Sequence, residues 1–336
     1  MNAVLRRRLL SVLRKFGKVR LVVAGDLVAD EFIYGRIDRV SREAPVLILS
    51  YDSTEVVPGG AGNAANNAVD LGARVSVVGV VGRDSAGSRL LDALGRRADV
   101  RAVSRISGFV TPVKTRILAG GVHSAKQQVV RIDRAGTRVP RRALAAAERA
   151  LAAALRRADA VILSDYGAGL ITPDLWARAL AAARVKRPPI VLVDSRYNLT
   201  EYRQVTACTP NEPEAEAALG VRIGDDAGAL ENAGRTLLSR LACRAVLITR
   251  GSRGMALFEP GRRTDHIPIV GSDQIADVTG AGDTVIATFT LALAAGASFG
   301  DAARLANHAG SIVVMKRGTA TVTREELEAS LLGGGV

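Results

Sequence analysis

Residues 278–284, with the sequence VTGAGDT, bring together groups that phosphoryl transfer to an alcohol requires. Two glycines let the backbone approach a ligand closely, and the stretch opens a predicted helix over 283–295 whose N-terminal amides would attract an anion. The carboxylate beside those amides, Asp283, can accept the proton of a hydroxyl group. A glycine turn with an aspartate helix cap explains the same residues, so the chemistry needs support from elsewhere in the chain.

A second glycine-rich stretch, 58–67 (PGGAGNAANN), allows two interpretations. Its degenerate G-x-G-x-x-A pattern, with Asp84 further on, fits a dinucleotide-binding turn. The predicted strand before it, 53–57, is short and runs into Pro58, unlike the buried strand that opens that motif. The three asparagines supply both donors and acceptors, which suits the hydroxyls of a polyol. We therefore favour a polyol site, and a plain turn capped by Asn63 stays open.

Two further clusters of oxygen ligands stand at predicted element ends. Asn211 and Glu214 lie three residues apart at a helix start and can share a face, where their oxygens would suit hydrated Mg²⁺. A helix cap with favourably placed acids is the alternative. Asp26 and Asp30 follow the first predicted strand, at the sheet end where ligands bind in open α/β folds. Neither a P-loop nor the protein-kinase H-R-D set occurs in the sequence.

Composition excludes several classes of protein. Hydrophobic residues make up 48% of the 336 residues, which excludes a disordered chain, and the most apolar stretch, 285–297, is too short to span a membrane. Two cysteines cannot form a disulfide framework, and arginines interrupt the N-terminus where a signal peptide would need an apolar run. We expect a cytoplasmic protein without a membrane span.

The net charge of +13 is concentrated at one end. Residues 1–20 hold seven basic residues and no acidic one, and residues 1–18 predict a basic helix with an apolar face. That helix either docks on the fold or contacts an anionic surface. The sequence has no basic patch interleaved with aromatic residues, so we expect no nucleic-acid partner.

Short apolar runs alternate with helical patterns and predict an α/β fold, a doubly wound sandwich with a mostly parallel sheet. The predicted strands are 19–24, 75–81, 160–163, 190–193 and 245–248. The predicted helices are 60–71, 85–94, 141–157, 173–184, 226–241, 283–295, 299–315 and one from Thr323. Insertions at about 31–51 and 111–133 predict a small antiparallel β-flap over one end of the sheet. With no linker or repeat, 19–332 reads as one domain.

Taken together, the stretch GGAGN at 59–63, the spacing Asn-x-x-Glu at 211–214 and Gly-Ala-Gly-Asp at 280–283 resemble the ribokinase-like (PfkB-type) carbohydrate kinases in order and spacing. The resemblance covers about residues 19–330. It implies a central sheet with helices on both faces, and a β-flap or lid that closes over a sugar and often makes a dimer contact. It also implies ATP as co-substrate and Mg²⁺, and leaves dependence on a monovalent cation open.

The resemblance also implies residue roles. It makes Asp283 the catalytic base, with the amides of Gly280, Ala281 and Gly282 as the anion hole. The implied sugar contacts are Asp26, Asp30, Gly59, Gly60 and Asn63. The implied nucleotide and metal contacts are Asp194, Arg196, Asn211, Glu214, Thr249, Gly251, Gly254 and Asn307, with Asn211 and Glu214 in the Mg²⁺–phosphate network. Arg196 stands where relatives often have Lys, which alters the geometry of that cation.

Within the family, residues 39–45 (RVSREAP) and 165–167 resemble the D-glycero-β-D-manno-heptose 7-phosphate kinases, as do 126–133, 277–286 and 318–322. A phosphorylated sugar needs cations and polar contacts, and the second insertion offers Lys114, Arg116, Lys126, Gln128 and Arg131, which a solvated flap edge would also explain. The resemblance implies the 1,7-bisphosphate as product, on the route to ADP-heptose. Because the chain stops at Val336, we expect a monofunctional kinase, a separate nucleotidyltransferase as pathway partner, and a homodimer through the flap.

Three alternatives remain at this point. The first is another kinase of the same type, acting on fructose 1-phosphate, ribose or a ketodeoxy acid. The second is a nicotinamide-dependent oxidoreductase that uses residues 60–65. The third is a non-catalytic binder or regulator, which only the basic N-terminal helix supports and against which the retained Asp283 argues.

Overall fold

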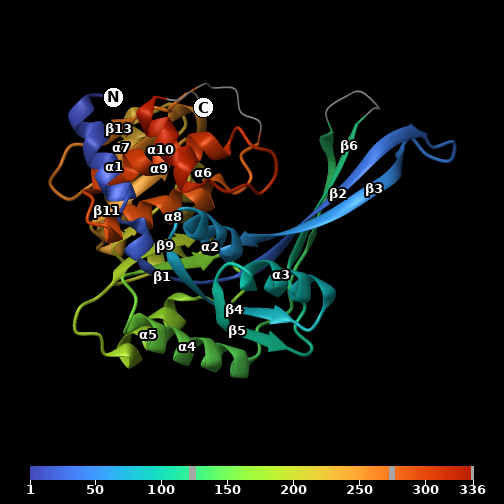
Figure 1. The fold of residues 1–336 in the computed structure, drawn as a ribbon, viewed down its shortest axis with the longest axis horizontal. Helices are drawn as coiled ribbons and strands as arrows, with labels where there is room; N and C mark the ends of the chain where they lie inside the picture. The colour runs from blue at the N-terminus through green and yellow to red at the C-terminus, as the bar shows by residue number, and fades with distance from the viewer. Residues whose placement is uncertain (121–125, 272–276, 334–336) are drawn as a thin grey trace.

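A computed structural model describes residues 1–120, 126–271 and 277–333. Its main sheet has nine strands in the order β13-β12-β11-β10-β9-β8-β1-β4-β5 (Figure 1). The strands from β11 to β5 are parallel, and β12 and β13 extend one edge in the antiparallel sense. Their bounds are β1 Arg20–Gly25, β4 Arg74–Gly82, β5 Asp99–Ile106, β8 Ala160–Asp165, β9 Ile190–Ser195, β10 Ala207–Cys208, β11 Ala245–Thr249, β12 Met255–Phe258 and β13 Asp265–Ile267.

Alternating apolar side chains explain why this sheet is covered on both faces. Leu21 and Val23 of β1 are buried in one hydrophobic cluster, whereas Val22 and Ala24 are buried in the other. Helices α1, α2, α3, α8, α9 and α10 contribute to the first cluster, and α4, α5, α6 and α7 to the second. In Figure 1, α4 and α5 of the second group lie on the opposite side of β1 from α2 and α8 of the first. The doubly wound α/β sandwich predicted from the sequence is confirmed.

Helix bounds agree with the predicted ranges to within a few residues. They are α1 Ala3–Leu13, α2 Ala61–Asp70, α3 Ser85–Gly95, α4 Arg141–Leu155, α5 Pro173–Ala183, α6 Glu212–Leu219, α7 Ala227–Leu241, α8 Ala281–Ala294, α9 Phe299–Val313 and α10 Arg324–Leu332. Short 3₁₀ turns occur at Phe16–Lys18, Leu199–Glu201 and Gly251–Arg253. Helix α10 begins with a reciprocal cap between Thr323 and Glu326, as its sequence predicts. Within the described ranges, no helix has the length and apolarity to cross a membrane.

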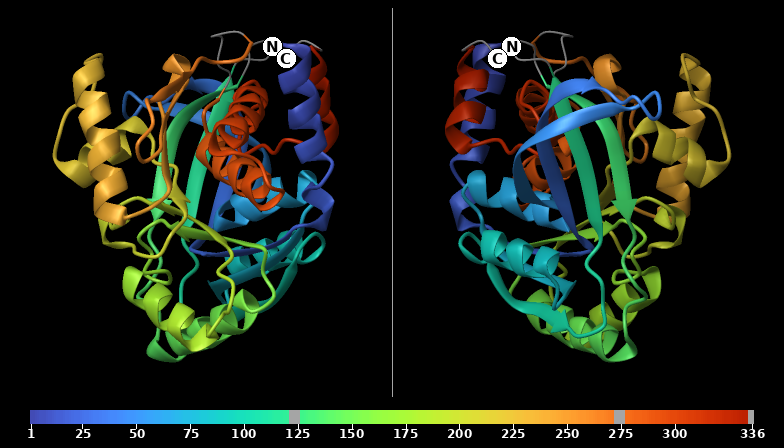
Figure 2. Two further views of the ribbon diagram at one scale, coloured as in Figure 1. Left: turned by 90° about the vertical axis from the view of Figure 1, so that its left-hand side faces the viewer. Right: turned by 90° about the vertical axis from the view of Figure 1, so that its right-hand side faces the viewer.

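The basic N-terminal segment forms α1, which lies beside α10 (Figure 2). Its apolar face is buried in the main core through Leu9, Leu13 and the following Phe16. Arg8 pairs with Asp301 of α9, with 2.7 Å between Nη2 and Oδ1. These contacts show that the helix packs on the body of the molecule through its apolar side.

A second sheet forms the flap, in the order β3-β2-β6-β7, and projects away from the helical layers (Figure 1). Its strands are β2 Leu27–Val40, β3 Leu47–Gly60, β6 Val113–Gly120 and β7 Gln127–Arg134. The prediction of an antiparallel flap is corrected: β2–β3 and β6–β7 are antiparallel hairpins, but β2 and β6 pair in parallel. Strand β2 follows the carboxyl end of β1, and β6 follows the carboxyl end of β5. Because β1 and β5 belong to the parallel part of the main sheet, β2 and β6 start from the same end of that sheet and run in the same direction.

The glycine-rich stretch at 58–67 also differs from its expected setting. The predicted short strand 53–57 is part of the long strand β3, which belongs to the flap and pairs antiparallel with β2. Helix α2 follows this flap strand directly. A dinucleotide-binding turn requires a parallel strand of the main sheet at this point, so the oxidoreductase interpretation lacks its structural context.

Candidate active site

Asp283 lies in the first turn of α8 and is almost completely buried. Its Oδ2 accepts a hydrogen bond from Asn63 Nδ2 at 2.9 Å, and its Oδ1 accepts one from the Tyr166 hydroxyl at 3.0 Å. The three residues come from α8, α2 and the loop after β8. The glycine-rich stretch at 58–67 and the C-terminal GAGD therefore meet at one carboxylate.

The orientation of Asn63 is fixed by a second asparagine. Asn67 Nδ2 donates to Asn63 Oδ1 at 3.2 Å, while Thr284 Oγ1 donates to Asn67 Oδ1 at 2.9 Å. Because the oxygen of Asn63 is already an acceptor, its amide nitrogen faces Asp283. Asn67 is thus an internal support and not the polyol contact that the sequence suggested for all three asparagines.

Burial raises the pKa of Asp283 to about 7, against the opposing effect of the hydrogen bonds from Asn63 and Tyr166. Asp30 also raises this pKa, and Lys114 lowers it. A carboxylate whose pKa lies near neutrality is suited to accept a proton from an alcohol and to release it again. The geometry supports a general base at this position.

The turn before α8 leaves little room around the base. Gly280 has φ of 78°, and a Cβ there would lie 2.4 Å from Asn63 Nδ2. The Ala281 amide donates to the Val278 carbonyl at 3.2 Å, so the turn itself uses one of the three amides assigned to an anion hole. Ala281 and Gly282 line a neighbouring cavity, which would place the start of α8 against a bound anion.

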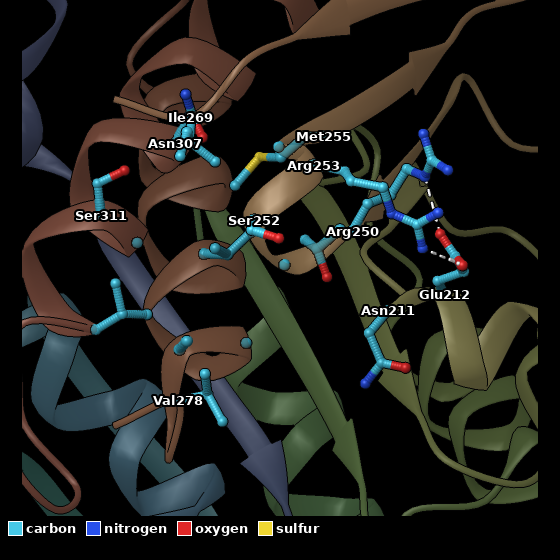
Figure 3. A pocket seen from close by; sticks show the side chains of 18 of the residues that line it. Asn211, Glu212, Arg250, Ser252, Arg253, Met255, Ile269, Val278, Asn307 and Ser311 are labelled. Atoms are coloured by element: carbon cyan, nitrogen blue, oxygen red, sulfur yellow. Dashed lines mark hydrogen bonds and ion pairs between the residues drawn. The ribbon is translucent and has the colours of Figure 1, made fainter. Parts of the chain in front are cut away.

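That cavity, the Gly282 pocket, has a volume of about 470 Å³ and lies between α8, α9 and the turn after β11 (Figure 3). Five of the predicted nucleotide contacts line this pocket. They are Asn211, Thr249, Gly251, Gly254 and Asn307. Asn307 Nδ2 donates to the Pro268 carbonyl at 2.7 Å, which joins α9 to the segment that follows β13. The pocket therefore brings together five of the eight residues that the sequence assigned to the nucleotide and metal. Of the other three, Asp194 and Glu214 are not in its lining, and Arg196 lines a different cavity.

A buried acid organises one wall of the Gly282 pocket. Glu212 accepts from Arg250 Nε at 2.8 Å and from Arg253 Nη2 at 2.6 Å, as the dashed lines in Figure 3 show. Both arginines belong to the turn after β11 that carries Gly251 and Gly254. Glu212 had no predicted role, although it lies between Asn211 and Glu214 in the sequence.

Asn211 and Glu214 cap α6 reciprocally. Asn211 Oδ1 accepts from the Glu214 amide at 2.8 Å, and Glu214 Oε2 accepts from the Asn211 amide at 2.9 Å. This is the cap that the sequence left open as the alternative to a metal site. Burial, Glu214 and Asp283 raise the pKa of Asp194 at the end of β9, so these carboxylates face a common region. Within the described ranges, no group of three His, Cys, Asp or Glu residues forms a ready metal cluster.

On the flap side, Asp30 occupies the centre of the predicted sugar contacts. Its Oδ1 accepts from Arg116 Nη1 at 2.7 Å, and its Oδ2 accepts from Thr319 Oγ1 at 3.0 Å. A Cβ at Gly59 would lie 2.3 Å from Asp30 Oδ2, so the glycine allows the close approach of β3. Gly60 ends β3 and precedes α2 directly. Arg116 is therefore paired with Asp30, and its contact with the substrate stays a prediction.

Asp26, predicted as a sugar contact, binds backbone amides. Its Oδ2 accepts from the amides of Tyr166 and Ala168 at 3.0 and 2.9 Å, and its Oδ1 accepts from the Leu170 amide at 3.2 Å. The carboxylate holds the loop after β8 through three backbone bonds. Burial raises the pKa of Asp26 to about 6.

A second cavity of about 470 Å³, the Lys114 pocket, is lined by residues of the flap and of the loops after β8 and β9. Its cationic side chains are Lys114, Arg134, Arg138 and Arg196. Lys114 Nζ lies 5.0 Å from the centre of the Tyr166 ring, and Arg196 Cζ lies 5.5 Å from it. Burial lowers the pKa of Lys114. Asp133 is the acidic residue in the same lining, so positive charges are in excess and the pocket fits an anionic group.

The remaining flap predictions lie on β7 or immediately before it. Arg131 is paired with Asp133, with 2.6 Å between Nη2 and Oδ2, and Gln128 is exposed. Lys126 Nζ pairs with Asp52 at 2.6 Å. These three side chains are not gathered around Asp283, and the cationic pocket uses Arg134, Arg138 and Arg196 in their place.

Tyr166 is the residue that sequence reasoning missed. It was part of the segment 165–167 that resembles heptose phosphate kinases, but no role followed from its type. Only the fold reveals that its hydroxyl reaches Asp283 and that its ring lies near two cations. Thr319, on the segment before α10, was likewise quoted without a role and contacts Asp30.

The fold and the site define a phosphotransferase: a buried base at a helix N-terminus lies between a pocket suited to a nucleotide and a flap-covered polar site. Residues 26–326 match the model of the pfkB family of carbohydrate kinases, and the chain belongs to that family. It is a kinase that acts on a sugar hydroxyl, and family membership implies ATP as its co-substrate.

Relatives and solved structures agree with this assignment. The chain is 44% identical over 318 residues to the bifunctional protein HldE of Geobacter metallireducens, covering 93% of this chain and 63% of that protein. It is 41% identical to HldE of Geobacter sulfurreducens, covering 97% and 66%. It therefore spans somewhat less than two thirds of these relatives.

Two solved structures share the fold. Arabidopsis thaliana ribokinase complexed with ribose and ATP has a TM-score of 0.71 at 22% identity, over 93% of this chain and 98% of that one. Escherichia coli phosphofructokinase-2 has a TM-score of 0.75 at 17% identity, over 94% and 99%. The ribokinase-like fold is confirmed.

Proposed function

We propose that the chain phosphorylates the anomeric hydroxyl of D-glycero-β-D-manno-heptose 7-phosphate with ATP, giving the 1,7-bisphosphate for ADP-heptose synthesis. The observation that carries the proposal is the Lys114 pocket, which has four cationic side chains in its lining. Two of them, Lys114 and Arg196, lie against the ring of Tyr166, whose hydroxyl contacts the base. A neutral sugar has no group that needs such a pocket. The kinship with the HldE proteins and the similarity of residues 39–45 to heptose 7-phosphate kinases support the same substrate.

The mechanism follows from the positions of the two pockets. Asp283 takes the proton of the acceptor hydroxyl. The oxygen of that hydroxyl attacks the γ-phosphorus, and the bond from this phosphorus to the bridging oxygen of ADP breaks. The nucleotide would lie in the Gly282 pocket, with its phosphates directed to the start of α8. The proton then leaves Asp283 for solvent, which its pKa of about 7 permits near neutral pH.

Asp194 and Glu214 would hold Mg²⁺ through water and the phosphates of ATP. Hydrated Mg²⁺ prefers carboxylate oxygens, and the two carboxylates are close enough for Glu214 to raise the pKa of Asp194. Because Asn211 and Glu214 already cap α6, Asn211 would contribute mainly by placing Glu214. When bound, the ion would neutralise charge on the phosphates. Thr249 and the turn at 251–254 would contact the nucleotide.

A homodimer through the flap is part of the proposal. On β7, Val130 and Ile132 are 46% and 51% exposed and alternate with Arg131, so they lie on the flap face opposite to Arg131. A second copy would cover this apolar face. Cytoplasmic location and a separate nucleotidyltransferase as pathway partner remain predictions from the sequence.

The test is ADP release with ATP and Mg²⁺ over heptose 7-phosphate, fructose 1-phosphate, fructose 6-phosphate and ribose. We expect strong preference for the heptose phosphate. Lys114→Ala and Arg196→Ala should each raise the acceptor KM about tenfold or more for a phosphorylated sugar. Arg101→Ala is the matched control, because Arg101 is exposed on β5 and pairs with Asp99. Equal turnover of ribose, or unchanged KM in both pocket variants, would contradict the substrate assignment.

A further inference from the structure

Tyr166 connects the base to the cationic pocket. It follows β8 directly, and its hydroxyl oxygen lies 3.0 Å from Asp283 Oδ1. Its ring lies within 5.5 Å of both Lys114 Nζ and Arg196 Cζ and lines the Lys114 pocket. One side chain therefore touches the proton acceptor at its tip and the two cations at its ring.

The backbone of Tyr166 is held by two buried carboxylates. Its own amide donates to Asp26 Oδ2 at 3.0 Å, and the Gly167 amide donates to Asp165 Oδ1 at 3.0 Å. Asp165 Oδ2 in turn accepts from the hydroxyls of Ser195 and Tyr202 at 2.8 and 3.0 Å. The ring therefore starts from a fixed backbone, and its hydroxyl reaches Asp283 without loop rearrangement.

The hydroxyl constrains the base in two ways. With Asn63 bound to Oδ2, a donor on Oδ1 stops the carboxylate from rotating about its terminal torsion. The same bond favours the charged form and works against the effect of burial on Asp283. Burial raises the pKa of Tyr166 well above its ordinary value, so the phenol stays a donor.

We propose that Tyr166 is the positioning residue for Asp283, and that it ties the orientation of the base to the occupant of the Lys114 pocket. An anionic group in this pocket would attract Lys114 and Arg196. Both cations lie against the ring of Tyr166, and this ring carries the hydroxyl that orients Asp283. This inference rests on the proposed function, because it requires an anionic acceptor. It assigns Tyr166 to the transfer step and the two cations to acceptor binding.

The other charged groups that face Asp283 are Asp30 and Lys114 from the flap and Asp194 from β9. These groups act on the base through their charge. Among the described residues that donate hydrogen bonds to the Asp283 carboxylate, Asn63 belongs to the sugar side of the site. Tyr166 is the donor whose ring also lines the cationic pocket.

Two variants separate the hydroxyl from the ring. Tyr166→Phe keeps the ring beside Lys114 and Arg196 but removes the bond to Asp283, so kcat should fall roughly 10- to 100-fold while the acceptor KM stays within about threefold. The acidic limb of the kcat/KM profile should move to higher pH, because the hydrogen bond from Tyr166 lowers the pKa of Asp283 and the Phe variant lacks this bond. Tyr166→Leu removes both contacts and should raise the acceptor KM as well.

Tyr202→Phe is the matched control, because it also removes a hydroxyl from a buried carboxylate, here Asp165. It should lower the melting temperature without moving the acidic limb. If Tyr166→Phe keeps kcat within about twofold, or changes only the acceptor KM, the positioning role is wrong. Asp283→Asn, measured beside it, separates the outcomes: an inactive Asn variant with an unimpaired Phe variant leaves the kinase assignment intact and removes Tyr166 from the mechanism.

Discussion

Asn63 and Asp283 are separated by 220 positions in the sequence, yet the amide nitrogen of one lies 2.9 Å from the carboxylate of the other. This bond joins α2, which follows the flap, to α8, which begins beside the Gly282 pocket. The sugar side and the nucleotide side of the site are therefore aligned through the base itself. A displacement of either helix would move the proton acceptor relative to its substrate.

Replacement of Asp283 by Asn should remove the proton acceptor and preserve the fold. We expect kcat to fall by about 10²–10⁴-fold, the range typical of a lost general base. The measurement is ADP release at saturating ATP, with ATP binding by calorimetry as the check on folding. Activity within tenfold of the unaltered chain would remove Asp283 from the role of base.

The same residue should make stability depend on pH. The pKa of Asp283 is raised from 3.8 to about 7 in the folded chain, so folding favours the protonated form. The stabilisation is complete below about pH 4 and is lost as pH rises through 7. Asp283→Asn does not titrate, so it should gain stability relative to the unaltered chain across this window. Urea unfolding at pH 5 and pH 8 measures the difference, which should be larger at pH 8.

Gly280→Ala should impair catalysis more than stability alone explains. Its φ of 78° is costly for alanine, and the new Cβ would collide with Asn63 Nδ2. Gly296→Ala is the control, since φ there is 91° but open space surrounds the Cβ position. Both variants should lose about 1 kcal/mol in unfolding free energy from strain. The Gly280 variant should in addition lose at least about tenfold in kcat. Equal activity of the Gly280 and Gly296 variants would contradict the claim that a side chain at position 280 displaces Asn63 from Asp283.

Glu212→Gln should weaken ATP binding. It leaves the Arg250 and Arg253 guanidinium groups without their common carboxylate, and these groups belong to the turn that lines the Gly282 pocket. We expect a rise in the KM for ATP of about tenfold with the acceptor KM unchanged. Initial rates with each substrate varied in turn provide the test, and a change confined to the acceptor would place Glu212 elsewhere in the mechanism.

The flap face should control association. Replacing Val130 and Ile132 together by Lys puts charge on the exposed apolar face of β7 and should convert a dimer into a monomer. Sedimentation velocity measures the mass before and after the change. Arg131 on the opposite face is paired with Asp133, and Arg131→Ala serves as the comparison that should leave the mass unchanged. A monomeric unaltered chain would overturn the dimer prediction directly.

The sequence predicted the main sheet well because its parallel strands are buried on both faces and therefore appear as continuous apolar runs. Strand β10 escaped prediction because it is only two residues long. Strands β5, β12 and β13 also escaped prediction. They lie at or next to the sheet edges, and β5 carries alternating charges through Arg101 and Arg105. The parallel pairing of β2 with β6 arises because both strands start from the carboxyl end of the main sheet. The local pattern of residues does not encode where in the sheet a strand starts.

Residue types identified the site but not all of the partnerships within it. Asp283, Asn63 and the lining of the Gly282 pocket are positions where local motif and fold agree. Arg116 and Asp26 have the chemistry of ligand contacts, yet their charges are taken up by Asp30 and by backbone amides. Such pairings join positions far apart in the sequence, and spacing alone gives no access to them. Tyr166 was hidden for the same reason.

Asp26 is the single residue between β1 of the main sheet and β2 of the flap. The 14 residues of β2 extend over about 45 Å at ~3.3 Å per residue, and the flap is also joined to the main body where β3 runs directly into α2. A rotation of about 5° about Asp26 would move the far end of β2 by about 4 Å while Asp26 itself stays almost in place. Since Asp26 also binds the amide of Tyr166, and β3 runs into the helix that carries Asn63, both of these donors to the Asp283 carboxylate are attached to the base of the flap.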